Sequence, residues 1–409
     1  MQEGTLSLIH IPLDLYSTFL QSILKVLLPQ TSSQPKDDNG DDQNGSLTVS
    51  DVPDRHGFLN ISVTPIECSI VCHTSWAKTV FEPAIQRLVP KELSKSVSVS
   101  KDAYNVFSVT SAGMDAASRV ADLTSPLALA RIPIFFITTY YSDFVLVPAK
   151  DRGRVVEALL ARGFTFVEDD NGSSSTFASS SSPTHSRHGS NTDPSSRIAA
   201  IRLPSPTTLP SSARELQDRT FENLKKQNVV PYLEPGLRLI HCAGREEWDA
   251  PGGYSERPSL SRGGMMNGSH RNGGRGGQTC WADTVDTKLY ASLVAALVSQ
   301  PKFLSVTLAK GDSPSLLLDR NLRASFGDSV IGPTDGSLVP IFLDLVDLPF
   351  EATGIVSGVA ETLVGEIRGS PELELSYLST ARAGAVILSS EKSSAALSVL
   401  SGLLVKESS

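Results

Sequence analysis

The feature that most constrains the fold is an internal repeat that covers most of the sequence. Residues 131–147 have the pattern of two apolar strands joined by a short polar turn, and a helical pattern follows over residues 149–162. Residues 373–388 show the same strand–turn–strand pattern, again followed by a helical one. A unit that recurs with its neighbours in the same order indicates one architecture used more than once.

The repeat extends upstream in both halves of the chain. Residues 6–10 match 237–241, and residues 58–63 match 303–308. The order strand, helix, strand, strand, helix, strand in units of about 70 to 80 residues predicts an antiparallel sheet with helices on one face. We therefore expect an α+β protein made of ferredoxin-like (βαββαβ) domains.

The expected domains are four, arranged in two tandem pairs. They span residues 1–100, 101–168, 235–338 and 339–409. Three Ser- or Gly-rich segments are predicted to be disordered because they cannot bury enough apolar surface, namely a loop at 29–57, a linker at 169–234 and an insertion at 244–279. Within the linker, residues 213–228 have the pattern of a short charged helix.

The charge and cysteine content narrow the class of protein. With 36 Lys plus Arg against 44 Asp plus Glu, the formal charge of -8 argues against nucleic-acid binding. The most apolar early segment, residues 19–28, is too short to span a bilayer, so we expect a protein that is not in the membrane. Four cysteines without framework spacing suggest a reducing, cytoplasmic compartment. Cys68 and Cys72 fall on one face of a strand and are interpreted as a buried structural pair, because a metal site needs two further ligands that the sequence does not place.

Catalytic signatures are missing from the sequence. There is no phosphate-binding glycine loop, no nucleophile elbow and no His-Glu-x-x-His zinc motif. His10 and His241 occupy the same position of the repeat, which favours a structural role over a catalytic one. We expect no enzyme activity, no cofactor and no metal.

Two loops have the features of a small-ligand site without catalysis. Residues 111–115 and 348–354 each precede a predicted helix, and a helix N-terminus suits a small carboxylate because its first N–H groups are unpaired. The alternative is ordinary capping of these helices by Asp115 and Glu351.

Residues 134–147, with the sequence IFFITTYYSDFVLV, resemble the second ACT domain of the CASTOR family. Members of that family are cytosolic arginine sensors of the TOR pathway, and their paired ACT domains are similar to those of aspartate kinases. The resemblance covers roughly residues 5–168 and 235–405 and implies four ACT domains. It also implies a non-enzymatic cytoplasmic protein that binds a small amino acid and a regulatory protein complex, and it is compatible with a homodimer.

The resemblance places the amino acid between the second and fourth domains. The residues that it implies for this site are Pro133, Ile134, Pro349, Phe350, Glu351, Thr353, Gly354, Ser379 and Thr380. Gly384 stands where the family carries the acidic residue that receives the arginine guanidinium, and only one acidic residue, Glu351, remains in the family's acidic loop. A buried guanidinium without a carboxylate costs several kcal/mol, so the sequence disfavours arginine as the ligand.

The turn between the two strands corresponds to the partner-binding surface of those sensors. Tyr140 and Asp143 are retained there, and Tyr141 replaces a glutamine. Two adjacent tyrosines cannot both point inward if the flanking strands keep their alternation, so we expect an exposed aromatic pair beside a carboxylate. The resulting hypothesis is an amino-acid sensor. The alternatives are a scaffold that has lost its ligand site and a regulatory subunit of an amino-acid biosynthetic enzyme.

Overall fold

The fold is that of a computed structural model, which describes residues 4–28, 57–110, 118–168, 175–179, 213–245, 286–310, 312–333, 335–349, 352–367 and 374–405. The predicted disordered loop at 29–57 and insertion at 244–279 lie outside these residues except for Gly57, Gly244 and Arg245. The candidate site residues Phe350 and Glu351 and the loop at 111–115 also lie outside them.

The first and third segments of the chain have the same order of elements. The first contains β1 (Leu6–Pro12), α1 (Tyr16–Leu27), β2 (Phe58–Val63), β3 (Glu67–His73), the short helices α2 (Thr74–Trp76), α3 (Glu82–Gln86) and α4 (Leu93–Ser96), and β4 (Ser98–Val99). The third contains β11 (Leu239–Gly244), α8 (Thr287–Val298), β12 (Leu304–Ala309), β13 (Ser315–Asp319), α9 (Arg323–Phe326) and β14 (Val330–Ile331). α1 forms here because Phe19, Ile23 and Val26 recur at helical spacing, and all three are fully buried.

The second and fourth segments follow a variant of this order. The second contains β5 (Tyr104–Thr110), α5 (Arg119–Leu129), β6 (Phe135–Thr138), β7 (Asp143–Pro148), α6 (Arg152–Leu160), β8 (Phe164–Glu168) and β9 (Ser175–Ser179). The fourth contains β15 (Leu338–Asp344), α10 (Ile355–Glu366), β16 (Ser376–Ser379), β17 (Ala383–Ser389) and α11 (Ser390–Leu404). The strand that flanks β15 comes from earlier in the chain and is β10 (Tyr232–Leu233).

Strand pairing joins segments that are far apart in the sequence. β2 pairs antiparallel with β12, which joins the first and third segments in the strand order β4-β1-β3-β2-β12-β13-β11-β14. β6 pairs antiparallel with β16, which joins the second and fourth in the order β8-β9-β5-β7-β6-β16-β17-β15-β10. We call these two runs of strands the first and the second sheet. Single residue pairs, Leu6 with Tyr104 and Leu239 with Leu338, connect them into one continuous 17-stranded sheet.

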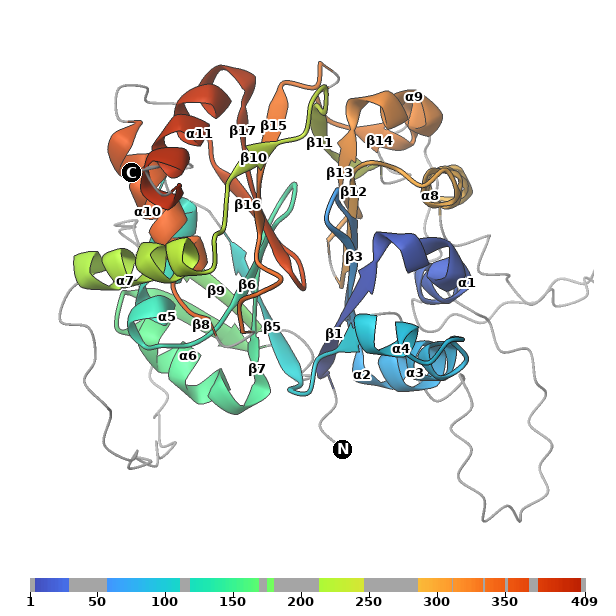
Figure 1. The fold of residues 1–409 in the computed structure, drawn as a ribbon, viewed down its shortest axis with the longest axis horizontal. Coiled ribbons are helices and arrows are strands. Elements are labelled where there is room, and N and C mark those ends of the chain that lie inside the picture. The colour runs from blue at the N-terminus through green and yellow to red at the C-terminus, as the bar shows by residue number, and fades with distance from the viewer. Residues whose placement is uncertain are drawn as a thin grey trace, which may run out of the picture.

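The two sheets face each other in the middle of the molecule and helices cover both outer faces (Figure 1). α1–α4, α8 and α9 lie over the first sheet, and α5, α6, α7, α10 and α11 lie over the second. Large apolar side chains such as Phe58, Phe303 and Phe342 are buried between the sheets. Each sheet therefore has helices on one face only, because its other face is covered by the opposite sheet.

The predicted disordered linker differs from the structure in its last part. Residues 213–226 form α7, which places Leu216, Phe221 and Leu224 against α10, α11 and α5. The short strand β10 follows it, and β9 lies earlier, paired in parallel with β5. The helical pattern at 213–228 is therefore confirmed by α7, whereas the strands β9 and β10 were not predicted within the Ser-rich linker.

The prediction that Cys68 and Cys72 are a buried pair is borne out. Cys68 and Cys72 are fully buried and free, and burial raises the pKa of the Cys72 thiol to about 12. Within the described part of the chain, no set of His, Cys, Asp and Glu side chains is grouped closely enough to bind a metal. None of the helices that the structure describes is both long and apolar enough to cross a bilayer.

Candidate functional site

The junction between β6 and β16 has a local twofold symmetry. Its centre is the pair Ile137 and Leu378. On one side, the backbone N–H of Phe136 donates to Ser379 Oγ at 2.9 Å. On the other, the backbone N–H of Tyr377 donates to Thr138 Oγ1 at 3.0 Å. The two halves of the repeat therefore present equivalent positions on opposite sides of the junction.

The turns that follow β6 and β16 repeat the same hydrogen bonds. The N–H of Thr139 donates to the carbonyl of Ser142 at 2.9 Å, and the N–H of Thr380 donates to the carbonyl of Ala383 at the same distance. The next residue of each hairpin is Asp143 in one half and Gly384 in the other. The position that carries a carboxylate in the second segment is thus a glycine in the fourth.

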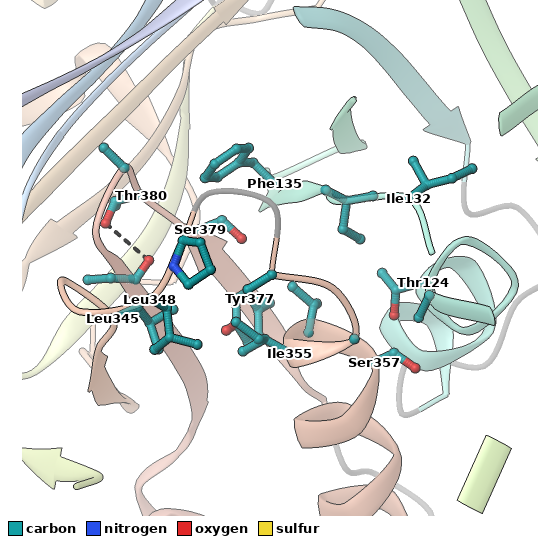
Figure 2. Close-up of a pocket in the computed structure, with 18 residues that line it drawn as sticks. Thr124, Ile132, Phe135, Leu345, Leu348, Ile355, Ser357, Tyr377, Ser379 and Thr380 are labelled. Carbon is teal, nitrogen blue, oxygen red and sulfur yellow. Dashed lines mark hydrogen bonds between the residues drawn. The ribbon is translucent and has the colours of Figure 1, made fainter. Parts of the chain in front are cut away.

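A cavity, here called cavity A, lies beside this junction (Figure 2). It has a volume of about 60 Å³ and is enclosed by the end of α5, the start of β6, the loop before α10 and the end of β16. Apolar and hydroxyl-bearing side chains line it, and none of the described lining residues is charged. The lining residues are Thr124, Ala128, Ile132, Ile134, Phe135, Leu345, Leu348, Pro349, Ala352, Gly354, Ile355, Val356, Ser357, Tyr377, Ser379, Thr380, Ala381 and Ala383.

Five of the nine residues expected at the ligand site line cavity A. They are Ile134, Pro349, Gly354, Ser379 and Thr380. Pro133 and Thr353 are next to lining residues in the sequence but do not line the cavity. The structure also adds residues that the sequence did not suggest, chiefly Thr124, Ser357 and Tyr377.

The N-terminus of α10 opens onto cavity A without a side-chain cap. Gly354 is the N-cap, has a left-handed backbone (φ 84°) and, as a glycine, offers no side-chain acceptor to the first-turn N–H groups. A side chain at Gly354 would approach Thr220 Oγ1 of α7 at 2.7 Å, so this turn requires glycine. α10 starts at Ile355 and α5 at Arg119. Glu351 and Asp115 lie outside the described residues, so capping by these two side chains stays a prediction.

The Tyr377 ring explains why no carboxylate stands at Gly384. A Cβ atom added to Gly384 would lie 2.3 Å from Tyr377 Oη. Tyr377 is almost fully buried, and this burial raises the pKa of its hydroxyl far above the usual range. The phenol therefore occupies, as a neutral group, the space into which an acidic side chain would extend.

We expect Gly384→Ala to lower the free energy of unfolding by about 1–3 kcal/mol, because the new methyl group overpacks a filled core position. Tyr377→Phe in the same chain should restore most of this loss by removing the clashing oxygen. Gly402→Ala in α11 is the matched control, since nothing lies within 4 Å of its added Cβ. Urea unfolding followed by circular dichroism measures the three variants, and an equal loss with and without Tyr377→Phe would refute this explanation.

The turn expected to bind a partner is only partly exposed. Tyr141 is 52% exposed, as predicted, and its ring packs edge-on against Tyr140 at 4.8 Å between centroids. Asp143 is fully buried, with Oδ2 at 2.6 Å from Nε of Arg119. The carboxylate beside the aromatic pair is therefore not on the surface, because Asp143 begins β7 and its side chain turns inward to meet α5.

A buried glutamate links cavity A to the first sheet. Glu67 Oε1 accepts hydrogen bonds from Thr380 Oγ1 and from the backbone N–H of Arg382, both at 2.6 Å. Its Oε2 lies 2.5 Å from Nδ1 of His10. The sequence analysis missed Glu67, although an acidic residue at the start of an otherwise apolar strand was a visible signal.

Comparison with known proteins identifies one domain type. Residues 99–161 match the family model described as ACT domain, and this stretch supplies Thr124, Ile132, Ile134 and Phe135 to cavity A. No curated protein matches the sequence.

Two solved structures are similar to the chain at low TM-scores. Protein Atu0741 from Agobacterium tumefaciens is 17% identical with a TM-score of 0.21, and the alignment covers 45% of this chain and 92% of that one. Aspartate kinase from Synechocystis is 10% identical with a TM-score of 0.27, and the alignment covers 99% of this chain. The chain thus spans about half of the kinase, 56% of its length.

Proposed function

We propose that this protein is a regulatory sensor that binds a small amino acid with an uncharged side chain in cavity A. The observation that carries the proposal is the position of this cavity. It lies between an ACT domain and the N-terminus of α10, whose N-cap is a glycine, so that a ligand carboxylate meets the first-turn N–H groups and the positive end of a helix.

The lining of cavity A favours a neutral ligand side chain over arginine. The hydroxyl groups of Thr124, Ser357 and Ser379 offer hydrogen bonds, but no described lining residue offers a charge to pair with a guanidinium. The volume of about 60 Å³ is several times the roughly 10–15 Å³ that one water molecule needs. A short amino acid fits this description better than a long cationic one.

Occupancy of cavity A is transmitted, in this proposal, through Thr380. Thr380 lines the cavity and donates to Glu67 of the first sheet, so a ligand that shifts Thr380 changes a contact between the two sheets. A ligand that prefers one packing of the sheets raises the population of that packing. The surface around the exposed Tyr141 then differs between the two packings, and a protein partner binds one of them, in the manner of the TOR-pathway sensors that the sequence resembles.

A scaffold without a ligand is the second candidate function. The filling of the Gly384 position by Tyr377 favours it, because the position that would supply the ligand's charged partner is closed. In that case the protein keeps the fold and the partner surface but responds to no amino acid.

Thermal unfolding of the full chain in the presence of each common amino acid distinguishes the two functions. A ligand at about 100 times its dissociation constant stabilises the fold by about 2.7 kcal/mol, which raises the melting temperature. Ile134→Trp, which fills cavity A, should abolish this shift. Val346→Trp is the matched control because Val346 is 47% exposed and does not line the cavity. No shift with any amino acid would reject the sensor and leave the scaffold.

A further inference from the structure

A second and larger cavity, here called cavity B, lies where the two sheets meet beside β11. Its volume is about 440 Å³. It is enclosed by the start of α5, the turn after β6, the middle of β11, the segment before β15 and the start of β16. The residues that line it are Arg119, Thr138, Thr139, Tyr140, Tyr141, Ser142, Leu239, Ile240, His241, Pro333, Asp335, Gly336, Ser337, Leu338, Glu374, Leu375, Ser376 and Ile387.

His241 lines this cavity and carries an unsatisfied polar atom. Its Nε2 is buried and has no hydrogen-bond partner among the described residues. The Tyr140 ring holds the imidazole edge-on at 5.6 Å between centroids. Burial, together with the charge of Arg119, lowers the pKa of His241 to about 4, so the imidazole is neutral near pH 7. A buried polar atom of this kind costs free energy unless a ligand or a water satisfies it.

The unsatisfied nitrogen of His241 is not a general feature of this position in the repeat, as the equivalent His10 shows. His10 occupies the equivalent position of β1, and its Nδ1 is 2.5 Å from Glu67 Oε2. In the third segment, β13 begins with Ser315, whose Oγ accepts from the N–H of Tyr140 instead. His241 therefore lacks the carboxylate partner that His10 has, and it lines cavity B.

Arg119 supplies a cation to the same cavity. Its Nε forms an ion pair with Asp143 at 2.6 Å, without the alignment of a hydrogen bond. A guanidinium has five N–H donors in a planar fork. The contact with Asp143 involves only Nε, which is one of its three nitrogens. Two exposed carboxylates, Asp335 and Glu374, complete the charged lining.

We infer that cavity B is a second ligand site, which takes a small zwitterion such as a free amino acid. The ligand carboxylate is held between Arg119 and His241, which donates from Nε2 in the matching tautomer. The ligand ammonium faces Asp335 and Glu374. This chemistry differs from that of cavity A, whose described lining residues carry no charge, and the site stands whether or not cavity A binds a ligand.

The location of cavity B ties it to the exposed turn. Tyr140 and Tyr141 line the cavity, and Tyr141 is also the exposed aromatic residue of the turn. A bound zwitterion contacts the inner side of this turn and so limits the positions that the two rings adopt.

Isothermal titration calorimetry of the full chain tests the site. The protein carries Ile134→Trp, so that cavity A is filled, and the probes are the twenty amino acids, acetate and methylamine. The expected result is binding of at least one amino acid, with acetate and methylamine each binding at least tenfold more weakly because each keeps one charge only.

Variants at the charged lining connect that binding to cavity B. His241→Phe removes the unpartnered nitrogen and should weaken binding at least tenfold, whereas His73→Phe, a half-buried histidine of β3 outside the cavity, should leave it unchanged. Glu374 is exposed, so Glu374→Gln should leave the fold intact. This variant should bind the amino acid several-fold more weakly and bind acetate with unchanged affinity. Binding that is unaffected by both His241→Phe and Glu374→Gln overturns the proposal, as does a lack of binding by all probes.

Discussion

Replacement of Arg119 by Met is expected to lower the free energy of unfolding by about 3–5 kcal/mol. Asp143, its partner, is fully buried at the first position of β7, and the Arg119 side chain is 20% exposed. Without the guanidinium, the buried Asp143 carboxylate loses the opposite charge that lies 2.6 Å from its Oδ2. Urea unfolding monitored by circular dichroism gives the loss.

The control for this prediction is removal of both charges. Arg119→Met combined with Asp143→Leu should recover most of the stability, because apolar groups of similar volume commonly replace a buried ion pair at little cost. Asp143→Asn completes the double-mutant cycle. A loss below about 1 kcal/mol for Arg119→Met would mean that the pair contributes no more than an exposed one.

Replacement of Glu67 by Leu is also expected to lower the free energy of unfolding by about 3–5 kcal/mol, but for a different reason. Glu67 is fully buried and accepts hydrogen bonds from Thr380 and from the Arg382 N–H, while its other oxygen contacts His10. Leucine removes this acceptor from the Arg382 N–H and leaves Thr380 Oγ1 with only the longer contact to the Ala383 carbonyl at 3.2 Å. A buried donor that loses its acceptor costs about 1–3 kcal/mol. The same unfolding measurement applies.

Glu67→Gln is the matched control because glutamine keeps the size and one carbonyl oxygen. That oxygen still accepts from Thr380 and Arg382, so the loss should be well under half of that for leucine. If glutamine costs as much as leucine, the contact with His10 carries the stability and the link to Thr380 does not. If neither variant is destabilised, Glu67 does not hold the two sheets together, and the proposed route from cavity A to the first sheet fails with it.

Local elements were predictable because their signals lie within a few residues. The alternation around the turn predicted strands at 133–139 and 144–147, and the structure has Phe135–Thr138 and Asp143–Pro148. The helical pattern at 149–162 corresponds to α6, Arg152–Leu160. The observed ends of these elements differ from the predicted ones by a few residues, as expected where turns and caps compete with the hydrogen bonds of strands and helices.

The candidate site was predictable in part. Ser379 and Thr380 end a strand of the repeat and do line cavity A, together with Ile134 from the other half. Arg119 was not singled out, although it forms the partner of Asp143 and lines cavity B. Its position at the first turn of α5 becomes informative only when α5 is placed beside the β6–β7 turn.

By itself, the sequence determined the order of strands and helices, the repeat, and the side chains that face inward, since period and composition act between near neighbours. Only the tertiary structure decided that β2 pairs with β12 and β6 with β16, that Tyr377 fills the space at Gly384, and that Glu67 reaches Thr380 across 313 residues of chain. Many strand pairings would bury the same apolar faces. The choice among them depends on the shape and hydrogen bonds of residues that meet only after folding.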